Sequence, residues 1–272
     1  NAAPPQGLHY ESSSPPQLRP VLEDKLILDG LDWSTDTFKN QAYNLLAGRM
    51  DLLKQHVAYK SSAILRLLRP DCNFVCIGDS AESDAFVYLG IALVAHGLLS
   101  KKGYWNYLVT FGIEAPVAQD IVDRYVQPGK MGRILQIFVR QLPKTPLVPD
   151  PLFSRGLTLF DSYLQVAIHA ARRGHLTQDR LKVLGRVFHN RYGLARPELV
   201  RMLGAVMAQA GGAQVTKAAC DELARYWDES HAGQSWVVGP DLADVTTPML
   251  NTDESAILAA AARWAGAMRS RK

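Results

Sequence analysis

The chain has 272 residues, of which 47% are hydrophobic and 21% are charged, so it can bury a core and is not globally disordered. Its formal net charge of +4, from basic residues spread along the chain, is too small to indicate nucleic acid as a partner. Since no apolar run approaches the ~20 residues that a membrane-spanning helix needs, we expect no transmembrane segment, and contact with a membrane surface stays open.

The predicted elements begin after a Pro- and Ser-rich start over residues 1–20. Helical spacing of apolar residues follows, and then a short apolar run with the length of a buried strand. In chain order we expect a helix within 41–67, a strand at 74–77, a helix at 85–99, an irregular aromatic stretch at 100–130 with a short helix at 116–125, and a strand at 132–139. The near-continuous apolar pattern of 132–139 is typical of a parallel strand that is covered on both faces.

An acidic turn follows the first of these strands. Gly78 lets the chain turn after residues 74–77, and two carboxylates come next, Asp79 and Asp84. Ligands of parallel α/β sheets bind just beyond the carboxyl ends of the strands, and carboxylate oxygens suit Mg²⁺. The alternative is purely structural: an Asp caps the next helix, and Glu82 lies in its first turn.

The second half of the chain has a different pattern. Residues 143–151 contain four prolines, as in a stiff linker. Beyond it we expect helices at 157–172, 178–191, 197–210, 216–227 and 253–269, with Thr177 and Asp253 as N-caps and Gly174 and Gly193 as C-terminal stops. The sequence therefore predicts an α/β unit over residues 1–142 and an all-helical region over 143–272.

Cysteines and histidines give no metal-binding pattern. Cys72, Cys76 and Cys220 cannot all pair with one another, and Cys76 lies in the apolar run, where it is expected to be a core residue. This usage favours a reducing compartment, and we expect a cytoplasmic protein, or one peripheral at a membrane. The histidines of the second half are too scattered for a metal site and are expected at surfaces or helix ends: His169, His175 and His189.

Three more features accompany the acidic turn: residues 10–15 (Tyr-Glu-Ser-Ser-Ser-Pro) upstream, Lys60 on an apolar-periodic helix, and the strand segment 132–140 downstream. A hydroxyl, a lysine and an acidic turn in that order suit phosphoryl transfer. The hydroxyl binds phosphoryl oxygens, the lysine neutralises charge, and the acids hold Mg²⁺.

Over about residues 8–142 these motifs resemble the haloacid dehalogenase superfamily and, within it, the catalytic domain of phosphatidate phosphatases of the yeast actin-patch type. Residues 77–84 with Tyr88 resemble the family's Gly-Asp-Ser-Gly-Glu-x-Asp…Tyr signature. Residues 10–15 resemble its Tyr-x-Ser-x-Ser-Pro motif, and residues 133–140 resemble its Arg-Ile-x-x-Ile-Tyr-Ile-Arg strand. The resemblance implies a haloacid dehalogenase-like, Rossmannoid parallel sheet, incomplete at its N-terminus.

The resemblance also implies roles. Ser12 would bind the phosphoryl group, Lys60 would be the third-motif lysine, Asp79 would ligate Mg²⁺, and Asp84 would support the metal or orient the lysine. The family usually has His before this lysine, and Tyr59 stands there instead. The structural alternatives are a turn serine, a solvated helix lysine, and carboxylates that serve as caps and surface charge.

Two departures from the family stand out. The superfamily nucleophile comes from an Asp-x-Asp-Gly-Thr motif before the serine motif, and the chain lacks it; Asp29 and Asp32 have the wrong spacing and follow the serine motif. We therefore expect this chain to be a fragment whose nucleophile lies upstream of Asn1. Such a fragment would have unpaired strand edges and would not catalyse turnover by itself. The stretch 100–130 is longer than in the family, and its aromatic residues indicate either a lid, a lipid-facing edge or packing.

The sequence thus predicts part of a Mg²⁺-dependent phosphatase that acts through an aspartyl-phosphate. Its partner would be a phosphorylated small molecule or lipid, with phosphatidate as the substrate that the resemblance suggests. The alternative is a non-catalytic, degenerate phosphatase fold that serves as a protein-interaction module. An Asp-x-Asp-Gly-Thr motif upstream of Asn1 in the gene would favour the enzyme.

Overall fold

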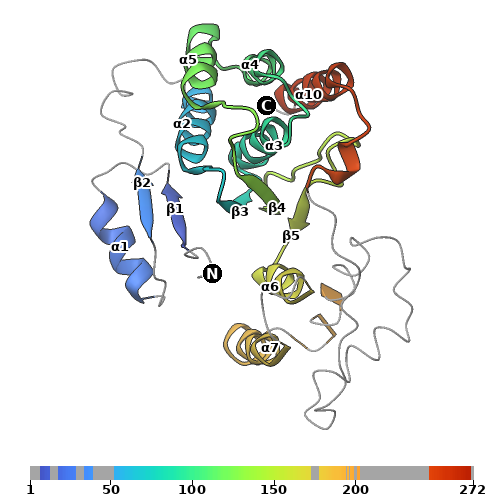
Figure 1. Ribbon diagram of the computed structural model, residues 1–272. Helices are drawn as coiled ribbons and strands as arrows, with labels where there is room; N and C mark the ends of the chain where they lie inside the picture. Colours follow the sequence, from blue (N-terminus) through green and yellow to red (C-terminus); the bar gives the residue numbers. More distant parts are fainter. Residues whose placement is uncertain are drawn as a thin grey trace.

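The computed structural model describes residues 7–12, 18–28, 34–38, 52–172, 178–193, 195, 197–198, 201–202 and 245–270. Its elements, labelled in Figure 1, alternate between strands and helices from residue 9 to residue 95, and two further helices precede the next strand. They are β1 (His9–Ser12), α1 (Arg19–Leu28), β2 (Thr35–Phe38), α2 (Leu52–Leu67), β3 (Asn73–Asp79), α3 (Asp84–Ala95), α4 (Lys101–Thr110), α5 (Ala115–Tyr125), β4 (Arg133–Arg140), β5 (Thr158–Phe160), α6 (Tyr163–Arg172), α7 (Gln178–Tyr192), the 3₁₀-helix η5 (Thr247–Met249) and α10 (Glu254–Arg269).

All strand pairs in the described residues are parallel, which confirms the α/β class. One sheet has the order β3-β4-β5, and a second sheet pairs β1 with β2. The side chains of β4 are buried along most of its length, as expected for a parallel strand that is covered on both faces. The strands predicted at 74–77 and 132–139 are confirmed, at Asn73–Asp79 and Arg133–Arg140.

The region after residue 143 is not all helical, so this part of the prediction is wrong. The segment expected as one helix over 157–172 begins with β5, which pairs with the end of β4, and only then forms α6. Thr158 and Phe160 are buried while Leu159 between them is less so. Three residues are too few for this period-2 alternation to stand out from the adjoining helical pattern. The sheet therefore extends past the expected boundary at residue 142.

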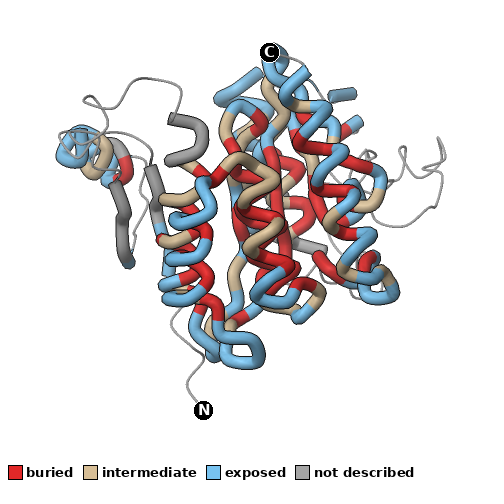
Figure 2. The backbone as a smooth tube through the Cα atoms, turned by 90° about the horizontal axis from the view of Figure 1, so that it is seen from above, coloured by how far each residue is buried: buried red, intermediate tan, exposed pale blue. Residues whose placement is uncertain are grey.

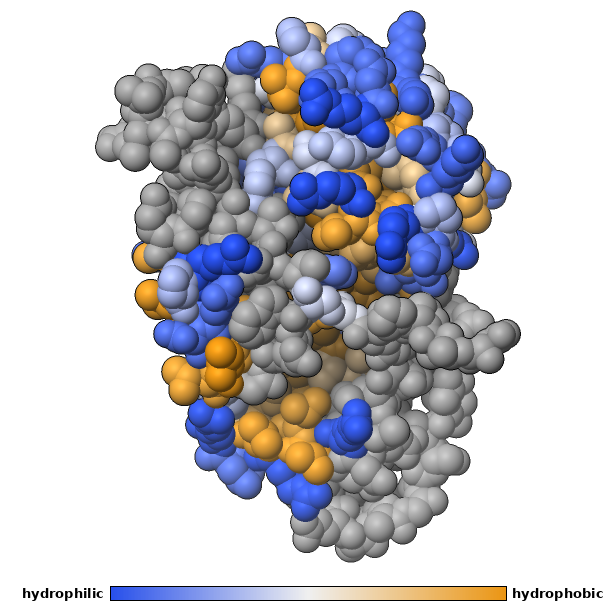
Figure 3. Space-filling view, turned by 60° about the vertical axis from the view of Figure 1, so that its left-hand side comes forward, coloured by the Kyte–Doolittle hydropathy of each residue, from blue (hydrophilic) through white to orange (hydrophobic). Residues whose placement is uncertain are grey.

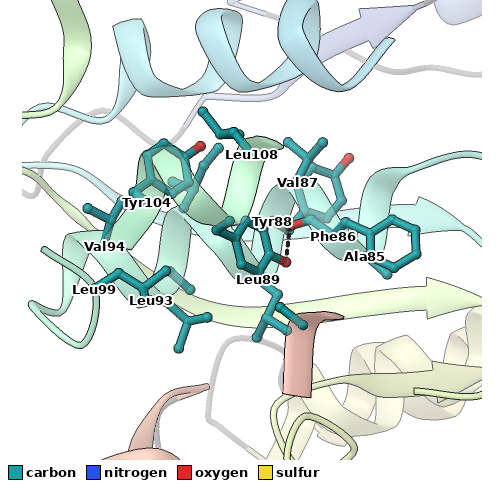
Figure 4. Close-up of a cluster of buried hydrophobic side chains, with 14 of the residues drawn as sticks. Ala85, Phe86, Val87, Tyr88, Leu89, Leu93, Val94, Leu99, Tyr104 and Leu108 are labelled. Atoms are coloured by element: carbon teal, nitrogen blue, oxygen red, sulfur yellow. Dashed lines mark hydrogen bonds between the residues drawn. The ribbon is translucent and has the colours of Figure 1, made fainter. Parts of the chain in front are cut away.

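α3 is the central helix of the core. Its residues from Asp84 to Val94 are all buried, so it has no polar face. Figure 4 shows side chains of α3, among them Phe86 and Leu89, gathered with Tyr104 and Leu108 of α4. In the view of Figure 2 the buried positions lie mainly where neighbouring helices face one another. α3 packs against β3 and β4 on the sheet and against α2 and α4.

The stretch 100–130 is predicted from the sequence to be irregular apart from one short helix. The short helix is confirmed as α5, but the part before it is also helical and forms α4. Ser100 caps α4, because its hydroxyl accepts a hydrogen bond from the Gly103 N–H at 3.0 Å. The aromatic rings Tyr104 and Tyr107 are buried, and the Tyr107 hydroxyl donates to the Phe86 carbonyl at 2.9 Å. Two of the aromatic residues proposed for a lid or lipid-facing edge are therefore core residues.

The C-terminal helix α10 packs on the same core. The predicted N-cap is confirmed, since an Asp253 carboxylate oxygen accepts from the Ala256 N–H at 2.8 Å. Trp264 lies against the Phe86 ring of α3, with ring centroids 4.3 Å apart, and also contacts Phe153. The Glu254 carboxylate accepts from the Ser100 N–H at 2.7 Å. Residues beyond 143 thus complete the core that the first half begins.

Some of the remaining sequence predictions are confirmed, and others lie outside the described residues. Cys76 is buried, and neither Cys72 nor Cys76 forms a disulfide with a described residue. Gly193 follows α7 with φ +66°, which suits a C-terminal stop. Several predictions lie outside the described residues: Cys220, His175, Thr177, Gly174, the helix at 216–227 and most of the helix at 197–210. Among the helices that are described, none is both long enough and apolar enough to cross a membrane.

Candidate functional site at the end of β3

The acidic turn lies at the carboxyl end of β3, as the sequence predicted. β3 ends at Asp79 and α3 begins at Asp84, so residues 80–83 form the connection. The Ser80 N–H donates to the Arg140 carbonyl at 2.9 Å, and the Ser80 hydroxyl accepts from the Leu142 N–H at 2.8 Å. These two bonds fasten the turn to the end of β4, so its position is fixed by the sheet.

Gly78 lets the carboxylate of Asp84 fold back over the end of β3. A Cβ at residue 78 would overlap the Asp84 side chain, including its Oδ2 atom. The same Oδ2 accepts a hydrogen bond from the Asp79 N–H at 3.1 Å. The glycine is therefore needed for a close approach, which agrees with its place directly before the acidic turn.

Asp79 organises the turn with one oxygen and leaves the other available. Its Oδ1 accepts hydrogen bonds from the Ala81 N–H at 2.9 Å and the Glu82 N–H at 3.2 Å. Its Oδ2 makes no hydrogen bond with any residue that the structure describes, and the residue is only partly buried. Such an arrangement presents one carboxylate oxygen at the end of the strand, where a hard cation would find a suitable ligand.

Lys60 is a buried residue of α2 and not a solvated helix lysine. It lies on the same side of α2 as Val57 and Ile64, and it is 5% exposed. Its Nζ atom binds Oδ1 of Asp84 and, at 2.6 Å, Oε2 of Glu82. The packing of α2 against α3 therefore brings Lys60 to the acidic turn, although 24 residues separate it from Asp84.

Burial and charge act in opposite directions on this ion pair. Burial by itself lowers the pKa of Lys60, but the charges and hydrogen bonds of Asp84 and Glu82 outweigh it and raise the pKa above its ordinary value. Burial raises the pKa of the Asp84 carboxyl, and Lys60 and the Asp79 N–H oppose that rise. Lys60 is therefore a cation at neutral pH, with two carboxyl groups beside it.

Ser12 ends β1 and lies in register with Phe38 of β2. Its side chain is outside the described part of the structure, so its approach to a phosphoryl group stays a prediction. The ring of His9, at the start of β1, lies 6.0 Å from the ring of Phe74 in β3. β1 and β3 therefore approach each other near their first residues.

Two residues of the site were not identified as functional from the sequence. Glu82 was considered only as a first-turn carboxylate, yet it binds Lys60, and Ser80 ties the turn to β4. The spacing of Glu82 and Asp84, two residues apart after a strand, was the available signal for a shared partner. It carried no information about which lysine that partner is.

Of the histidines predicted at surfaces or helix ends, two lie in the described residues, and His175 does not. His169 is buried with its ring edge-on to the Phe138 ring at 5.6 Å, and His189 is exposed on α7. Across the described ranges, no group of three or more His, Cys, Asp or Glu side chains is arranged to hold a metal ion. Asp79 is thus one suitable ligand, and a Mg²⁺ site would need further oxygens from water, substrate or other parts of the protein.

No protein-family model, curated protein sequence or solved structure matches the chain. The haloacid dehalogenase resemblance therefore stays a prediction that rests on the sequence motifs.

Proposed function

We propose that this chain carries the lysine and metal-binding part of a Mg²⁺-dependent phosphatase of the haloacid dehalogenase type. The substrate is a phosphomonoester, and phosphatidate is the candidate that the motifs suggest. The observation that carries this proposal is the buried pair of Lys60 and Asp84 beside Asp79, at the carboxyl end of a parallel strand. Lysines are rarely buried unless they are paired, and this pair lies at the strand end where ligands of parallel sheets bind.

Each residue has a distinct task in this proposal. Asp79 would hold Mg²⁺ through its available oxygen, and the bound metal would neutralise charge on the phosphoryl group. Lys60 would bind a phosphoryl oxygen, and Asp84 would orient the lysine through the contact that the structure shows. A role for Asp84 as a direct metal ligand stays a prediction. The Ser12 hydroxyl would donate a hydrogen bond to a second phosphoryl oxygen.

The nucleophile would be a carboxylate outside this chain's sequence. One of its oxygens would form a bond to phosphorus while the bond from phosphorus to the alcohol oxygen breaks, and the alcohol would leave with a proton donated by a general acid that, like the nucleophile, lies outside this chain's sequence. Water would then hydrolyse the aspartyl-phosphate, which restores the carboxylate and releases inorganic phosphate.

The surface of β3 leaves room for such a segment. The side chains of Val75 and Ile77, which share one face of β3, are 47% and 46% exposed. The edge of β3 opposite β4 pairs with no strand in the described part of the chain. Parallel sheets are usually covered on both faces, so a further strand and helix beside β3 would complete this sheet and bring a strand end next to Asp79.

Activity of the complete gene product tests the proposal. We expect Mg²⁺-dependent release of phosphate from phosphatidate, and a loss of about 100-fold or more in Asp79→Asn, as for removal of a transition-state charge stabiliser. Asp123→Asn, which changes an exposed carboxylate of α5, is the matched control and should keep full activity. Undiminished activity in Asp79→Asn would remove the site assignment.

A second candidate is the non-catalytic module. The observation in its favour is that Lys60 and Asp84 satisfy each other, so the cluster is stable without a ligand. In that case the complete protein would show no Mg²⁺-dependent phosphatase activity, and the gene would have no Asp-x-Asp-Gly-Thr motif upstream of Asn1.

A further inference from the structure

The two carboxylates that bind Lys60 are held very differently. The Asp84 side chain is 8% exposed, and its second oxygen is fixed by the Asp79 N–H over the glycine at residue 78. The Glu82 side chain is 36% exposed and belongs to the turn before α3. Asp84 is thus a fixed partner of Lys60, and Glu82 is its partner on the solvent side.

The position of Glu82 matters for any anion that approaches Lys60. The Nζ atom of Lys60 has three N–H donors, and two of them bind carboxylates. Lys60 is only 5% exposed and Glu82 is the more exposed of its two partners, so an anion that approaches the ammonium from the side of Glu82 meets this carboxylate first. Both groups are negative and compete for the same ammonium.

We propose that Glu82 is a displaceable counter-ion, which occupies the anion position at Lys60 in the ligand-free protein and leaves it when a phosphoryl group binds. Asp84 keeps its contact throughout and maintains the orientation of the lysine. This inference rests on the proposed function, because it takes the arriving anion to be a phosphoryl group. Glu82 acts only through its contact with Lys60 and does not itself bind the phosphoryl group.

The exchange has a consequence for selectivity. An anion that replaces a carboxylate must bind the ammonium better than the carboxylate does, and a phosphoryl dianion offers more charge and more acceptor oxygens than a monoanion. Displacement of Glu82 therefore favours phosphate over singly charged anions such as acetate. A neutral Gln at position 82 would compete less with an arriving anion for Lys60, and it would therefore also reduce the preference for phosphate over singly charged anions.

The test is the binding of inorganic phosphate to the 272-residue chain, measured by isothermal titration calorimetry at low salt. We expect Glu82→Gln to bind phosphate about 1.5- to fivefold more tightly than the unaltered chain, which is the range for loss of one partly exposed charge pair. Glu114→Gln, at an exposed glutamate before α5, is the matched control and should leave the affinity unchanged. The difference should shrink in 0.5 M salt, because screening weakens charge competition at the surface.

A double variant, Lys60→Met with Asp84→Asn, tests whether the phosphate binds at Lys60 without leaving a buried charge unpaired. Loss of phosphate binding in this variant supports the inference. Equal affinities of the Gln variants at 82 and 114 overturn it, and so does an absence of phosphate binding in every variant. If the complete protein shows no phosphatase activity, the enzymatic function is rejected. Tighter phosphate binding by Glu82→Gln would still support the counter-ion role in that case.

Discussion

At the scale of single residues, Asp84 makes close contacts with three other residues of the site: Lys60, Gly78 and Asp79. Its carboxylate binds Lys60 with one oxygen and the Asp79 N–H with the other, and it fits only because residue 78 has no Cβ. A buried carboxylate is stable in such a place only when its hydrogen bonds and its charge are both matched. Changes to any of these neighbours should therefore affect stability more than changes to exposed residues.

Replacement of Gly78 by Ala is expected to destabilise the protein by about 1–3 kcal/mol, because the new methyl group overlaps the Asp84 side chain, which is held in place by Lys60 and the Asp79 N–H. Urea denaturation followed by circular dichroism measures this change. Gly266→Ala in α10 is the control, since its Cβ would meet no atom within 4 Å, and it should be neutral or stabilising. Equal effects of the two variants would contradict the close approach.

Lys60→Met should cost about 3–5 kcal/mol at pH 7, because it leaves Asp84 buried without its cation. The double variant with Asp84→Asn should recover most of that loss, since no unpaired charge then remains. Urea denaturation of both variants and of the unaltered chain gives the comparison. A double variant as unstable as Lys60→Met would show that the charge is not the cause.

The pH dependence of the Lys60→Met variant should have a definite sign. Burial raises the pKa of Asp84, and without Lys60 the pKa rises further. The folded state then keeps a proton that the unfolded chain releases above about pH 4, so stability falls as the pH rises. The variant should therefore lose less free energy of unfolding, relative to the unaltered chain, at pH 4 than at pH 7. Urea denaturation midpoints of both proteins at the two pH values measure this difference.

At the scale of elements, α3, α4 and α10 share one aromatic cluster. Phe86, Phe111 and Trp264 come from or directly follow these three helices, and their ring centroids lie 4.3–6.2 Å apart. Tyr107 adds its ring at 4.8 Å from Phe111. Aromatic side chains bury large areas, so this cluster is the main apolar connection between the C-terminal helix and the rest of the core.

Trp264→Ala should destabilise the protein by about 3–5 kcal/mol, because it removes a buried ring from the centre of this cluster. The free energy of unfolding in urea is the measurement. Leu250→Ala, at a side chain that is 57% exposed, should change it by less than about 0.5 kcal/mol. A similarly small effect at Trp264 would mean that α10 does not contribute to the core.

At the scale of the whole molecule, the sheet and the core both cross the expected boundary at residue 142. β5 pairs with β4, and α10 packs against α4 and, through Trp264, against Phe86 of α3. Asp150 and Arg263 add an ion pair at 2.9 Å between the linker and α10. Figure 3 shows apolar side chains at the surface among charged ones. Exposed apolar residues of α1 include Val21, Ile27 and Leu28.

Truncation after residue 142 should therefore abolish cooperative unfolding, because it uncovers the edge of β4 and the aromatic face of α3 and α4. Urea denaturation and binding of a hydrophobic dye would compare the fragment with the complete chain. A fragment 1–142 that unfolds cooperatively without dye binding would establish the first part as an independent domain.

The sequence by itself determined the features that depend on neighbouring residues: the β3 strand with its glycine and acidic turn, the β4 strand and the Asp253 cap of α10. Strand pattern, turn chemistry and capping act over a few residues, so they can be read locally. Only the tertiary structure decided that Lys60 is buried against Asp84 and Glu82, and that residues 158–160 join the sheet as β5. The lysine's partners depend on how α2 packs against α3, and so short a strand takes its stability from pairing with β4 and not from its own pattern.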